Sequence, residues 1–381
     1  MLIRSIEERM LANLRPGKAV ILLGARRTGK TFLLKKLAGQ FGPDCLFING
    51  EDVSVQEILQ RRTKANYESF LEGKNILLID EAQKIDNIGL ILKLMIDSFE
   101  NLKIVATGSS AFDLTGRLGE PLTGRSTHIK LFPLAEDEYI DRIDFTQIND
   151  RLNERLIFGS YPEVFLTESI SAKEDYLRDL VNSYLLKDIL EFDGIKNSGK
   201  IKNLLRLLAF QTGSTVSVNE LGTQLGIARN TVERYLELLE KVFVIFRLEG
   251  FSRNLRKEIS KNSKWYFVDN GIRNALNADF KRPELRSDTG MLWENYIISE
   301  RIKSLSNKNI HANLYFWRTY DRQEIDLIEE RDGILNAAEF KAGNSKPKIP
   351  KLFLETYPDS VFRTITPDNY RQWLVGGETV K

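Results

Sequence analysis

The most regular pattern in the first third of the chain is a series of short apolar runs. They lie at residues 19–23, 76–79 and 102–106. The first two are continuous, and the third is interrupted only by Lys103. Uninterrupted apolar runs of this length are typical of parallel strands that are buried on both faces. Residues 32–37, which follow the first run, have helical spacing. The pattern therefore predicts strands at the core of an α/β domain, with a helix after the first strand.

The next segment is predicted to be helical. From about residue 133 to residue 196, apolar and polar residues recur at helical spacing on both sides of the sequence Gly-Ser-Tyr-Pro-Glu at 159–163. Glycine and proline so close together indicate a turn between two helices. We interpret this segment as a small helical lid.

A different pattern begins at Ser217. Ser217 and Glu220 have the spacing of a capping box, Gly226 marks a tight turn, and a second helix is expected from residue 228 to about 241. This pattern predicts a helix-turn-helix. The outward face of the second helix carries Arg229, Asn230, Glu233 and Arg234.

The residues after this helix favour a winged helix. The stretch 247–264 contains six basic and two acidic residues, a net charge of +4, and we interpret it as a basic wing. Two interpretations stay open, because such a unit either contacts DNA or serves only for packing between domains.

The C-terminal region contains a strong hairpin signal. Arg-Asp-Gly at 331–333 separates two predicted strands, 323–330 and 334–341. A turn centred between the last two of these residues pairs Asp326 with Glu339 and Glu324 with Lys341, and all four side chains then share one face. Three acids and one lysine form a candidate Mg²⁺ site. The alternative is an exposed charged hairpin.

Length and composition limit the classes of protein that fit the chain. Its 381 residues suffice for more than one hydrophobic core. Its 42% hydrophobic and 28% charged residues exclude disordered and collagen-like classes. One cysteine and two histidines exclude an internal disulfide and an all-Cys/His zinc site. The net charge of +2 means that any attraction to nucleic acid must come from local patches.

The hydrophobic pattern also bears on location. No apolar run approaches the roughly 20 residues that span a bilayer. The N-terminal residues mix acids and bases where a secretory signal would be apolar. We therefore expect a cytoplasmic protein without a membrane partner.

The strongest chemical signal follows the first predicted strand. The sequence matches GxxxxGK[ST], between that strand and the helix after it, which is the context that a P-loop requires. Backbone N–H groups of such a loop surround the phosphates, and its lysine and hydroxyl serve the phosphate oxygens and Mg²⁺. The sequence thus predicts ATP and Mg²⁺ as cofactors, bound by Gly24, Ala25, Arg26, Arg27, Thr28, Gly29, Lys30 and Thr31.

Two further runs complete the expected nucleotide site. The run at 76–79 ends in Asp80 and Glu81, which is typical of a Walker B strand. We expect Asp80, with Thr31, to hold Mg²⁺, and Glu81 to polarise the attacking water. The third strand runs into hydroxyl residues, among which Ser109 is the preferred sensor and Thr107 the second choice.

The order of these strands resembles the AAA-type ATPases. The resemblance implies a five-stranded parallel sheet flanked by helices, and an arginine supplied in trans by a neighbouring copy. Candidates for that arginine are Arg117 and Arg125, with Arg125 ranked first. A homo-oligomer is therefore an expected assembly.

A second resemblance concerns the predicted hairpin. Asp326 followed by Glu339-Phe-Lys341 resembles the D…ExK core of the restriction-endonuclease-like fold, and Glu294 matches the helical acid of that fold. The complete layout is similar to a widespread prokaryotic AAA-type ATPase family whose C-terminal domain has no known function. This resemblance implies an α/β chain of four parts: an ATPase core (1–132), a helical lid (133–196), a winged helix (197–270) and a restriction-endonuclease-like domain (271–381).

The leading functional hypothesis is an ATPase that couples its nucleotide state to the winged-helix and nuclease-like region and acts on DNA. A second hypothesis is an ATP-gated, Mg²⁺-dependent nuclease. A third is an ATP-switched protein-interaction scaffold without DNA activity.

Overall fold

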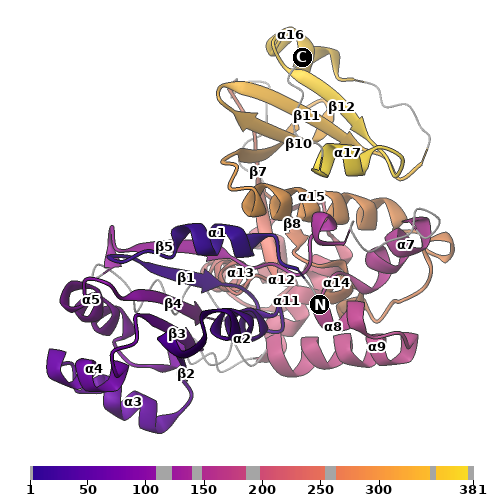
Figure 1. Cartoon of the computed structure of the whole chain (residues 1–381). Helices are drawn as coiled ribbons and strands as arrows, with labels where there is room; N and C mark the ends of the chain where they lie inside the picture. Colours follow the sequence, from indigo (N-terminus) through magenta and orange to yellow (C-terminus); the bar gives the residue numbers. More distant parts are fainter. Residues whose placement is uncertain are drawn as a thin grey trace. The chain divides into compact units, whose positions relative to one another are not determined.

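Five parallel strands form a sheet in the first third of the chain (Figure 1), in the order β2-β3-β4-β1-β5. Every neighbouring pair of these strands is parallel. The bounds are β1 (Ala19–Leu23), β2 (Cys45–Asn49), β3 (Ile76–Asp80), β4 (Lys103–Gly108) and β5 (Ser126–Lys130). The strands expected from the apolar runs are confirmed as β1, β3 and β4. Because β4 lies between β1 and β3, the carboxyl ends of these three strands meet at one edge of the sheet.

The structure is a computed structural model, and it describes residues 3–108, 122–139, 148–185, 198–253, 263–343 and 349–375. The chain forms two compact units. Unit 1 is Met1–Pro133 with Lys241–Phe243, and unit 2 is Leu134–Glu240 with Val244–Lys381. Of the boundaries expected from the sequence, the first lies next to Pro133, whereas those after residues 196 and 270 fall inside unit 2.

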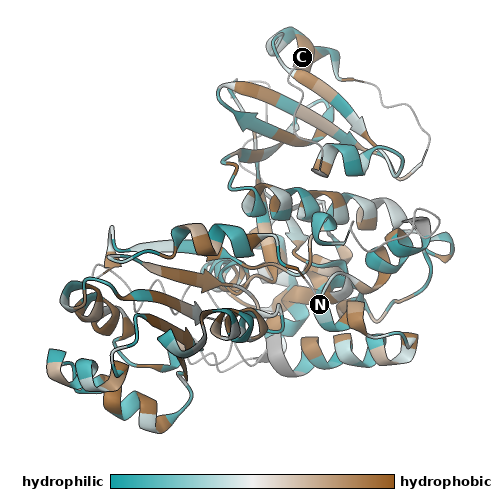
Figure 2. Cartoon of the chain, in the orientation of Figure 1, coloured by the Kyte–Doolittle hydropathy of each residue, from teal (hydrophilic) through white to brown (hydrophobic). Residues whose placement is uncertain are grey.

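Helices surround the parallel sheet and complete the core of unit 1. They are α1 (Ile6–Asn13), α2 (Lys30–Phe41), α3 (Val53–Gln60), α4 (Lys64–Leu71) and α5 (Ile88–Ser98), with 3-10 turns η1 (Gly42–Asp44) and η2 (Ala82–Lys84). All residues of β1 and β3 are buried, and Figure 2 shows β1 in brown. Leu33, Leu34 and Leu37 of α2 belong to the same buried cluster as Val20 and Leu22 of β1. This packing fixes the strand and the helix on either side of the loop that joins them.

Unit 2 begins with the helices expected between residues 133 and 196. They are the 3-10 turn η4 (Glu136–Glu138), α7 (Ile148–Phe158), α8 (Pro162–Leu166), α9 (Ile170–Asp179) and the π-helical segment η7 (Leu180–Leu185). The turn predicted after residue 158 is confirmed, since Gly159 has a φ of 73°. A Cβ on Gly159 would lie 2.0 Å from Oδ1 of Asp269, and the Asp269 carboxylate accepts the N–H of Ser160 at 2.6 Å. Glycine is therefore required at this turn.

The predicted helix pair lies further along unit 2. α11 (Ser198–Phe210) precedes the short strand β6 (Thr215–Val216), α12 (Val218–Leu225) and α13 (Arg229–Lys241). Ser217 accepts a hydrogen bond from the N–H of Glu220, as expected for the capping box, and Gly226 has a φ of 62°. Two antiparallel strands follow, β7 (Ile245–Gly250) and β8 (Ser263–Phe267). Residues 254–262, which hold much of the expected basic wing, lie outside the described residues.

A second sheet joins residues 197–270 and 271–381, which the sequence assigns to two separate domains. Its order is β12-β11-β10-β9-β7-β8-β6, and Figure 1 labels β7, β8, β10, β11 and β12 of this sheet. β7 pairs in parallel with β9 (Asn313–Arg318) through Glu249 opposite Tyr315 and Gly250 opposite Phe316. The remaining elements are β10 (Glu324–Arg331), β11 (Ile334–Phe340), β12 (Val361–Ile365), α14 (Asn270–Asn277), η8 (Pro283–Leu285), α15 (Thr289–Asn307), α16 (Lys351–Thr356) and α17 (Tyr370–Val375).

The hairpin between β10 and β11 has the predicted register. Leu327 lies opposite Ala338 and Arg331 opposite Ile334, so the turn is centred between Asp332 and Gly333. Both turn residues have positive φ angles, 49° and 79°. A two-residue turn of this kind suits the right-handed twist of the strands that flank it. In the part of the chain that the structure describes, no helix is both long and apolar enough to cross a membrane.

Buried polar residues hold α15 in unit 2. Asn295, Ser299, Glu300, Arg301 and Lys303 of this helix are all buried, and the helix is largely teal and white in Figure 2. Each of them has a partner: Asn295, for example, accepts the N–H of Phe267 at 2.7 Å, and Arg301 pairs with Glu329. A helix with so many buried polar residues depends on these partners, because an unpaired buried polar group is costly.

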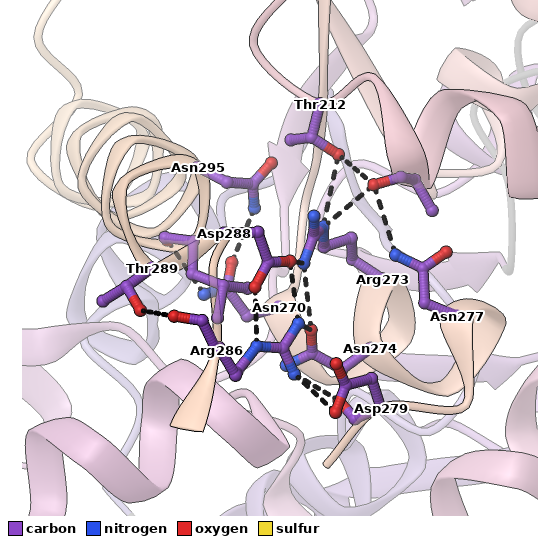
Figure 3. Close-up of polar contacts among 12 residues, drawn as sticks. Thr212, Asn270, Arg273, Asn274, Asn277, Asp279, Arg286, Asp288, Thr289 and Asn295 are labelled. Atoms are coloured by element: carbon purple, nitrogen blue, oxygen red, sulfur yellow. Dashed lines mark hydrogen bonds and ion pairs between the residues drawn. The ribbon is translucent and has the colours of Figure 1, made fainter. Parts of the chain in front are cut away.

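A network of buried arginines precedes α15 (Figure 3). Asp288 accepts hydrogen bonds from Nη1 of Arg273 at 2.5 Å and from Nε of Arg286 at 2.8 Å. Arg273 also donates to the carbonyl of Ala209 in α11, and Arg286 donates to Oδ1 of Asn274 in α14. The network thus connects α11, α14 and the start of α15 through one carboxylate.

Replacing Asp288 by alanine is expected to lower the free energy of unfolding of unit 2 by about 3 kcal/mol, because two buried guanidinium groups lose the carboxylate that they share. The side chains of Arg273 and Arg286 are each 1% exposed. All four tryptophans, at 265, 293, 317 and 373, lie in unit 2, so urea unfolding followed by tryptophan fluorescence reports on this unit. Asp359→Ala, at an exposed site of the same unit, is the control.

The contribution of Asp288 also depends on pH. Burial alone would raise the pKa of this carboxyl, but the hydrogen bonds and charges of Arg286 and Arg273 outweigh burial and lower it. A lowered pKa in the folded state gives stability that is present above the unfolded value of about 3.9 and is lost as the pH falls further. Equal stability of the Asp288→Ala and Asp359→Ala variants at pH 7 would contradict a role for this ion pair.

Candidate nucleotide-binding site

The loop between β1 and α2 has the backbone geometry of a phosphate-binding loop. A Cβ on Gly24 would lie 2.2 Å from the carbonyl oxygen of Leu131, so only glycine fits there. Gly29 has a φ of 98°, which favours glycine, and it directly precedes the first residue of α2. Backbone N–H groups at the start of a helix are unsatisfied within the helix, and together with its dipole they attract anions.

Lys30 is folded back onto this loop. Its ammonium donates to the carbonyl oxygens of Gly24 and Ala25, both at 2.9 Å, and the residue is buried. The Thr28 hydroxyl donates to the carbonyl of Ala25 at 2.9 Å. These hydrogen bonds within the loop hold the positively charged ammonium inside it.

Asp80 lies between two threonines at the edge of the sheet. The hydroxyl of Thr31 donates to Oδ2 of Asp80 at 2.6 Å, and the hydroxyl of Thr107 donates to Oδ1 at 2.6 Å. Asp80 and Thr107 are buried at the ends of β3 and β4. The structure thus brings Thr31 and Asp80 together, as the sequence predicts. Their hydroxyl and carboxylate oxygens are ligand types that Mg²⁺ prefers, so this pair fits a magnesium ion bound with phosphates.

Glu81 follows Asp80 in a left-handed conformation, with a φ of 49°. Its N–H donates to the hydroxyl of Thr107 at 3.1 Å, and its carboxylate accepts a hydrogen bond from the amide of Gln83. Glu81 is half-buried and Gln83 is buried. One threonine of β4 therefore contacts both acids of the predicted pair, and a buried amide fixes the direction of the second carboxylate.

The remaining candidates of the ATPase core are placed differently. Ser109, the preferred sensor, and Arg117 lie outside the described residues. Arg125 precedes β5, and its backbone carbonyl accepts the N–H of Ala19 at the beginning of β1. Arg125 therefore lies at the opposite edge of the sheet from the loop, about 16 Å away along a five-residue strand. Its exposed side chain pairs with Asp97 at 2.9 Å. The role of Arg125 as an arginine supplied in trans stays a prediction.

Two residues near the loop are missing from the sequence prediction. Gln83 lies two positions after Glu81, a spacing that gives a weak signal. Arg4 precedes all the motifs, and no pattern in the sequence points to it, yet its guanidinium contacts the loop. Thr107, the second choice as sensor, contacts both acids.

The C-terminal candidate residues lie in a separate cluster in unit 2. Oδ2 of Asp326 accepts the N–H of Phe340 at 2.8 Å, and Lys341 donates to Glu339 at 2.7 Å. Burial, together with the carboxylates of Glu294 and Glu339, raises the pKa of Asp326 to about 8. The structure therefore brings the three residues of the D…ExK pattern and the helical acid Glu294 near one another.

A lysine that the sequence analysis assigned to the basic wing neutralises this cluster. The buried ammonium of Lys264 pairs with Glu324 at 2.5 Å and with Glu294 at 3.3 Å, and Tyr266 donates to Glu294 at 2.7 Å. Within the described ranges, no three acidic, histidine or cysteine side chains are arranged to hold a metal ion. Lys264 therefore supplies a positive charge to this cluster, and the Mg²⁺ site expected on the hairpin stays a prediction.

Three segments of the chain match known sequence families. Residues 16–140 match a family described as an AAA domain, and this segment contains the loop, Asp80, Glu81 and Thr107. Residues 149–284 and 289–374 match two families that are each described as a domain of unknown function, DUF8612 and DUF4143. The chain therefore contains an AAA-type P-loop ATPase domain, followed by two segments whose families carry no assigned activity.

Similar proteins have been found by sequence and by structure. The uncharacterized protein MJ1544 of Methanocaldococcus jannaschii is 26% identical over 96% of this chain and 87% of its own length. An uncharacterized protein of Haemophilus influenzae is 28% identical over 66% of this chain and 68% of its own length. AMPPCP-bound DnaA from Aquifex aeolicus is 13% identical, with a TM-score of 0.31, over 62% of this chain and 86% of that chain. Thermotoga maritima RuvB is 18% identical, with a TM-score of 0.31, over 60% and 82%.

Proposed function

We propose that this chain binds ATP with Mg²⁺ at the β1–α2 loop and hydrolyses it. The observation that carries the proposal is the convergence of Thr31, Asp80, Thr107 and Glu81 beside the loop that holds Lys30. In such a site the loop N–H groups and the lysine bind the phosphates. Bound Mg²⁺ would neutralise charge on the phosphate oxygens.

Each residue has a defined task in this proposal. Lys30 leaves the carbonyls of Gly24 and Ala25 and contacts the β- and γ-phosphates. Thr31 and Asp80 would hold the magnesium ion, and Glu81 would accept a proton from the attacking water or orient it. The hydroxyl of Thr107 fixes the positions of Asp80 and Glu81, because it donates to the Asp80 carboxylate and accepts the N–H of Glu81. Positioning and electrostatics supply most of the catalysis in phosphoryl transfer, and a preformed site of this kind supplies both.

The finer proposal concerns DNA. Arg229, Asn230 and Arg234 are exposed on the outward face of α13, as a groove-reading helix requires. Arg229 is paired with Glu233 at 2.9 Å, however, so part of this face is neutral. We propose that DNA contact at α13 changes the rate of ATP turnover, and that Arg234 contributes to this contact.

Duplex or single-stranded DNA is expected to raise ATP turnover by about twofold or more at low salt, and the increase should shrink as salt rises, since phosphate contacts are screened. Steady-state phosphate release measures this. Arg234→Ala should reduce the response, whereas Lys281→Ala, which removes a charge from another exposed site of unit 2, should not. An ATP turnover rate that is the same with and without DNA would overturn the DNA proposal and favour a protein-interaction scaffold.

The nuclease hypothesis has less support in the described residues. A metal-dependent nuclease needs its carboxylates free to bind the ion, whereas Glu294 and Glu324 are paired with Lys264. Glu339 is likewise paired with Lys341. We therefore propose that this cluster stabilises unit 2, with Lys264 in place of a metal ion.

A further inference from the structure

Arg4 contacts the nucleotide loop from outside the recognised motif. The residue is 6% exposed, and it precedes both α1 and the segment that matches the AAA domain family. Its Nη1 donates to the carbonyl oxygen of Thr28 at 2.7 Å, and its Nη2 donates to the carbonyl oxygen of Phe132 at 2.7 Å. One guanidinium therefore joins the loop to the segment that follows β5.

The contact at Thr28 has a consequence for the next residue. In a trans peptide the C=O of one residue and the N–H of the following residue point in opposite directions. The Thr28–Gly29 peptide is trans, so fixing the Thr28 carbonyl toward Arg4 turns the Gly29 N–H away from Arg4. In the described part of the chain this N–H makes no backbone hydrogen bond, and it is one of the donors at the start of α2.

The surroundings make this orientation specific. A Cβ on Gly29 would lie 3.8 Å from Nη1 of Arg4, which places the guanidinium beside this peptide. The Thr28 hydroxyl bonds to Ala25 within the loop, so the carbonyl of Thr28 has Arg4 as a partner on its outer side. Without the guanidinium, a buried carbonyl would lack that partner, and rotation of the peptide toward water would relieve the cost.

We propose that Arg4 is a positioning residue for phosphate binding: it orients the Thr28–Gly29 peptide so that the Gly29 N–H points at the phosphates of a bound nucleotide. This inference rests on the proposed binding of ATP at the loop. The alternative is a brace that connects two segments of unit 1 and has no effect on nucleotide affinity.

The test compares Arg4→Ala, Arg4→Lys and Arg15→Ala with the unchanged full-length chain. Lysine keeps the charge but lacks the planar fork that reaches two carbonyls. Arg15 is an exposed arginine of the same N-terminal segment, so Arg15→Ala controls for the loss of one positive charge. Calorimetric titration with ADP gives the dissociation constant, steady-state turnover gives KM and kcat, and thermal melting shows that each variant is folded.

We expect Arg4→Ala to raise the dissociation constant for ADP, and the KM for ATP, by about tenfold to a hundredfold. The reason is that the hydrogen bond from the Gly29 N–H to a charged phosphate is lost. The value of kcat at saturating ATP should stay within about twofold. Arg4→Lys should give a smaller loss, and Arg15→Ala none.

Two results would overturn the inference. One is an Arg4→Ala or Arg4→Lys variant with a lower melting temperature but an unchanged dissociation constant for ADP. This result would show that Arg4 only connects two segments of unit 1. The other is a fall in kcat with KM unchanged. If the unchanged chain itself fails to bind ADP, the proposed function fails first, and this result is distinct from a selective defect of the variants. If Arg4→Ala does not fold, the dissociation constant of the Arg4→Lys variant for ADP decides between the two roles.

Discussion

Replacing Lys30 by alanine is expected to weaken ATP and ADP binding by about a hundredfold or more. The ammonium is buried in the loop and lies 2.9 Å from two loop carbonyls. Phosphate oxygens of a bound nucleotide would replace these carbonyls as its partners. Charge-assisted hydrogen bonds to phosphate are roughly twice as strong as neutral ones. Losing two of them corresponds to about 3 kcal/mol or more.

The measurement is a calorimetric titration with ADP and with a non-hydrolysable ATP analogue. Lys35→Ala is the matched control, because Lys35 is exposed on the same helix and has the same charge. The control should bind as tightly as the unchanged chain. A Lys30→Ala variant with unchanged affinity would show that nucleotide does not bind at this loop.

The second large effect is expected from Glu81→Gln. Glutamine has nearly the shape of glutamate and leaves the N–H bond to Thr107 in place, but it cannot accept a proton from water. General-base catalysis contributes about 10² to 10⁴ in rate, so turnover should fall by at least about a hundredfold. Binding of ATP should change little, since the loop, Lys30 and Asp80 are untouched.

Phosphate release at saturating ATP measures this prediction, beside a binding titration of the same variant. Glu68→Gln, at an exposed position of α4 in the same unit, serves as the control and should have normal turnover. Normal turnover in the Glu81→Gln variant would remove Glu81 from the mechanism. Loss of ATP binding in this variant would show that Glu81 contributes to nucleotide binding and not only to the chemical step.

Local patterns were sufficient to predict three of the five strands of the parallel sheet and the loop after the first. Uniformly apolar strands and the glycine-lysine motif depend on neighbours in sequence, and β1, β3 and β4 lie where these patterns place them. The hairpin of β10 and β11 was predictable for the same reason, since its Asp332-Gly333 turn fixes the register.

Contacts between distant segments explain what the sequence could not predict. The pairing of β7 with β9 involves two residue pairs from strands more than sixty residues apart, and it merges two segments into one sheet. Lys264 reads as a surface base in a basic stretch, and only the fold shows the two carboxylates that permit its burial. Arg4 likewise has acceptors 24 and 128 residues away.

We propose that this chain hydrolyses ATP at the β1–α2 loop with Glu81 as the base. The most direct measurement is Mg²⁺-dependent phosphate release from ATP by the full-length chain, run side by side with its Glu81→Gln variant at equal nucleotide occupancy. We expect turnover by the unchanged chain and at least about a hundredfold less by the variant. Equal rates for the two, or no turnover by the unchanged chain with ATP bound, would contradict it.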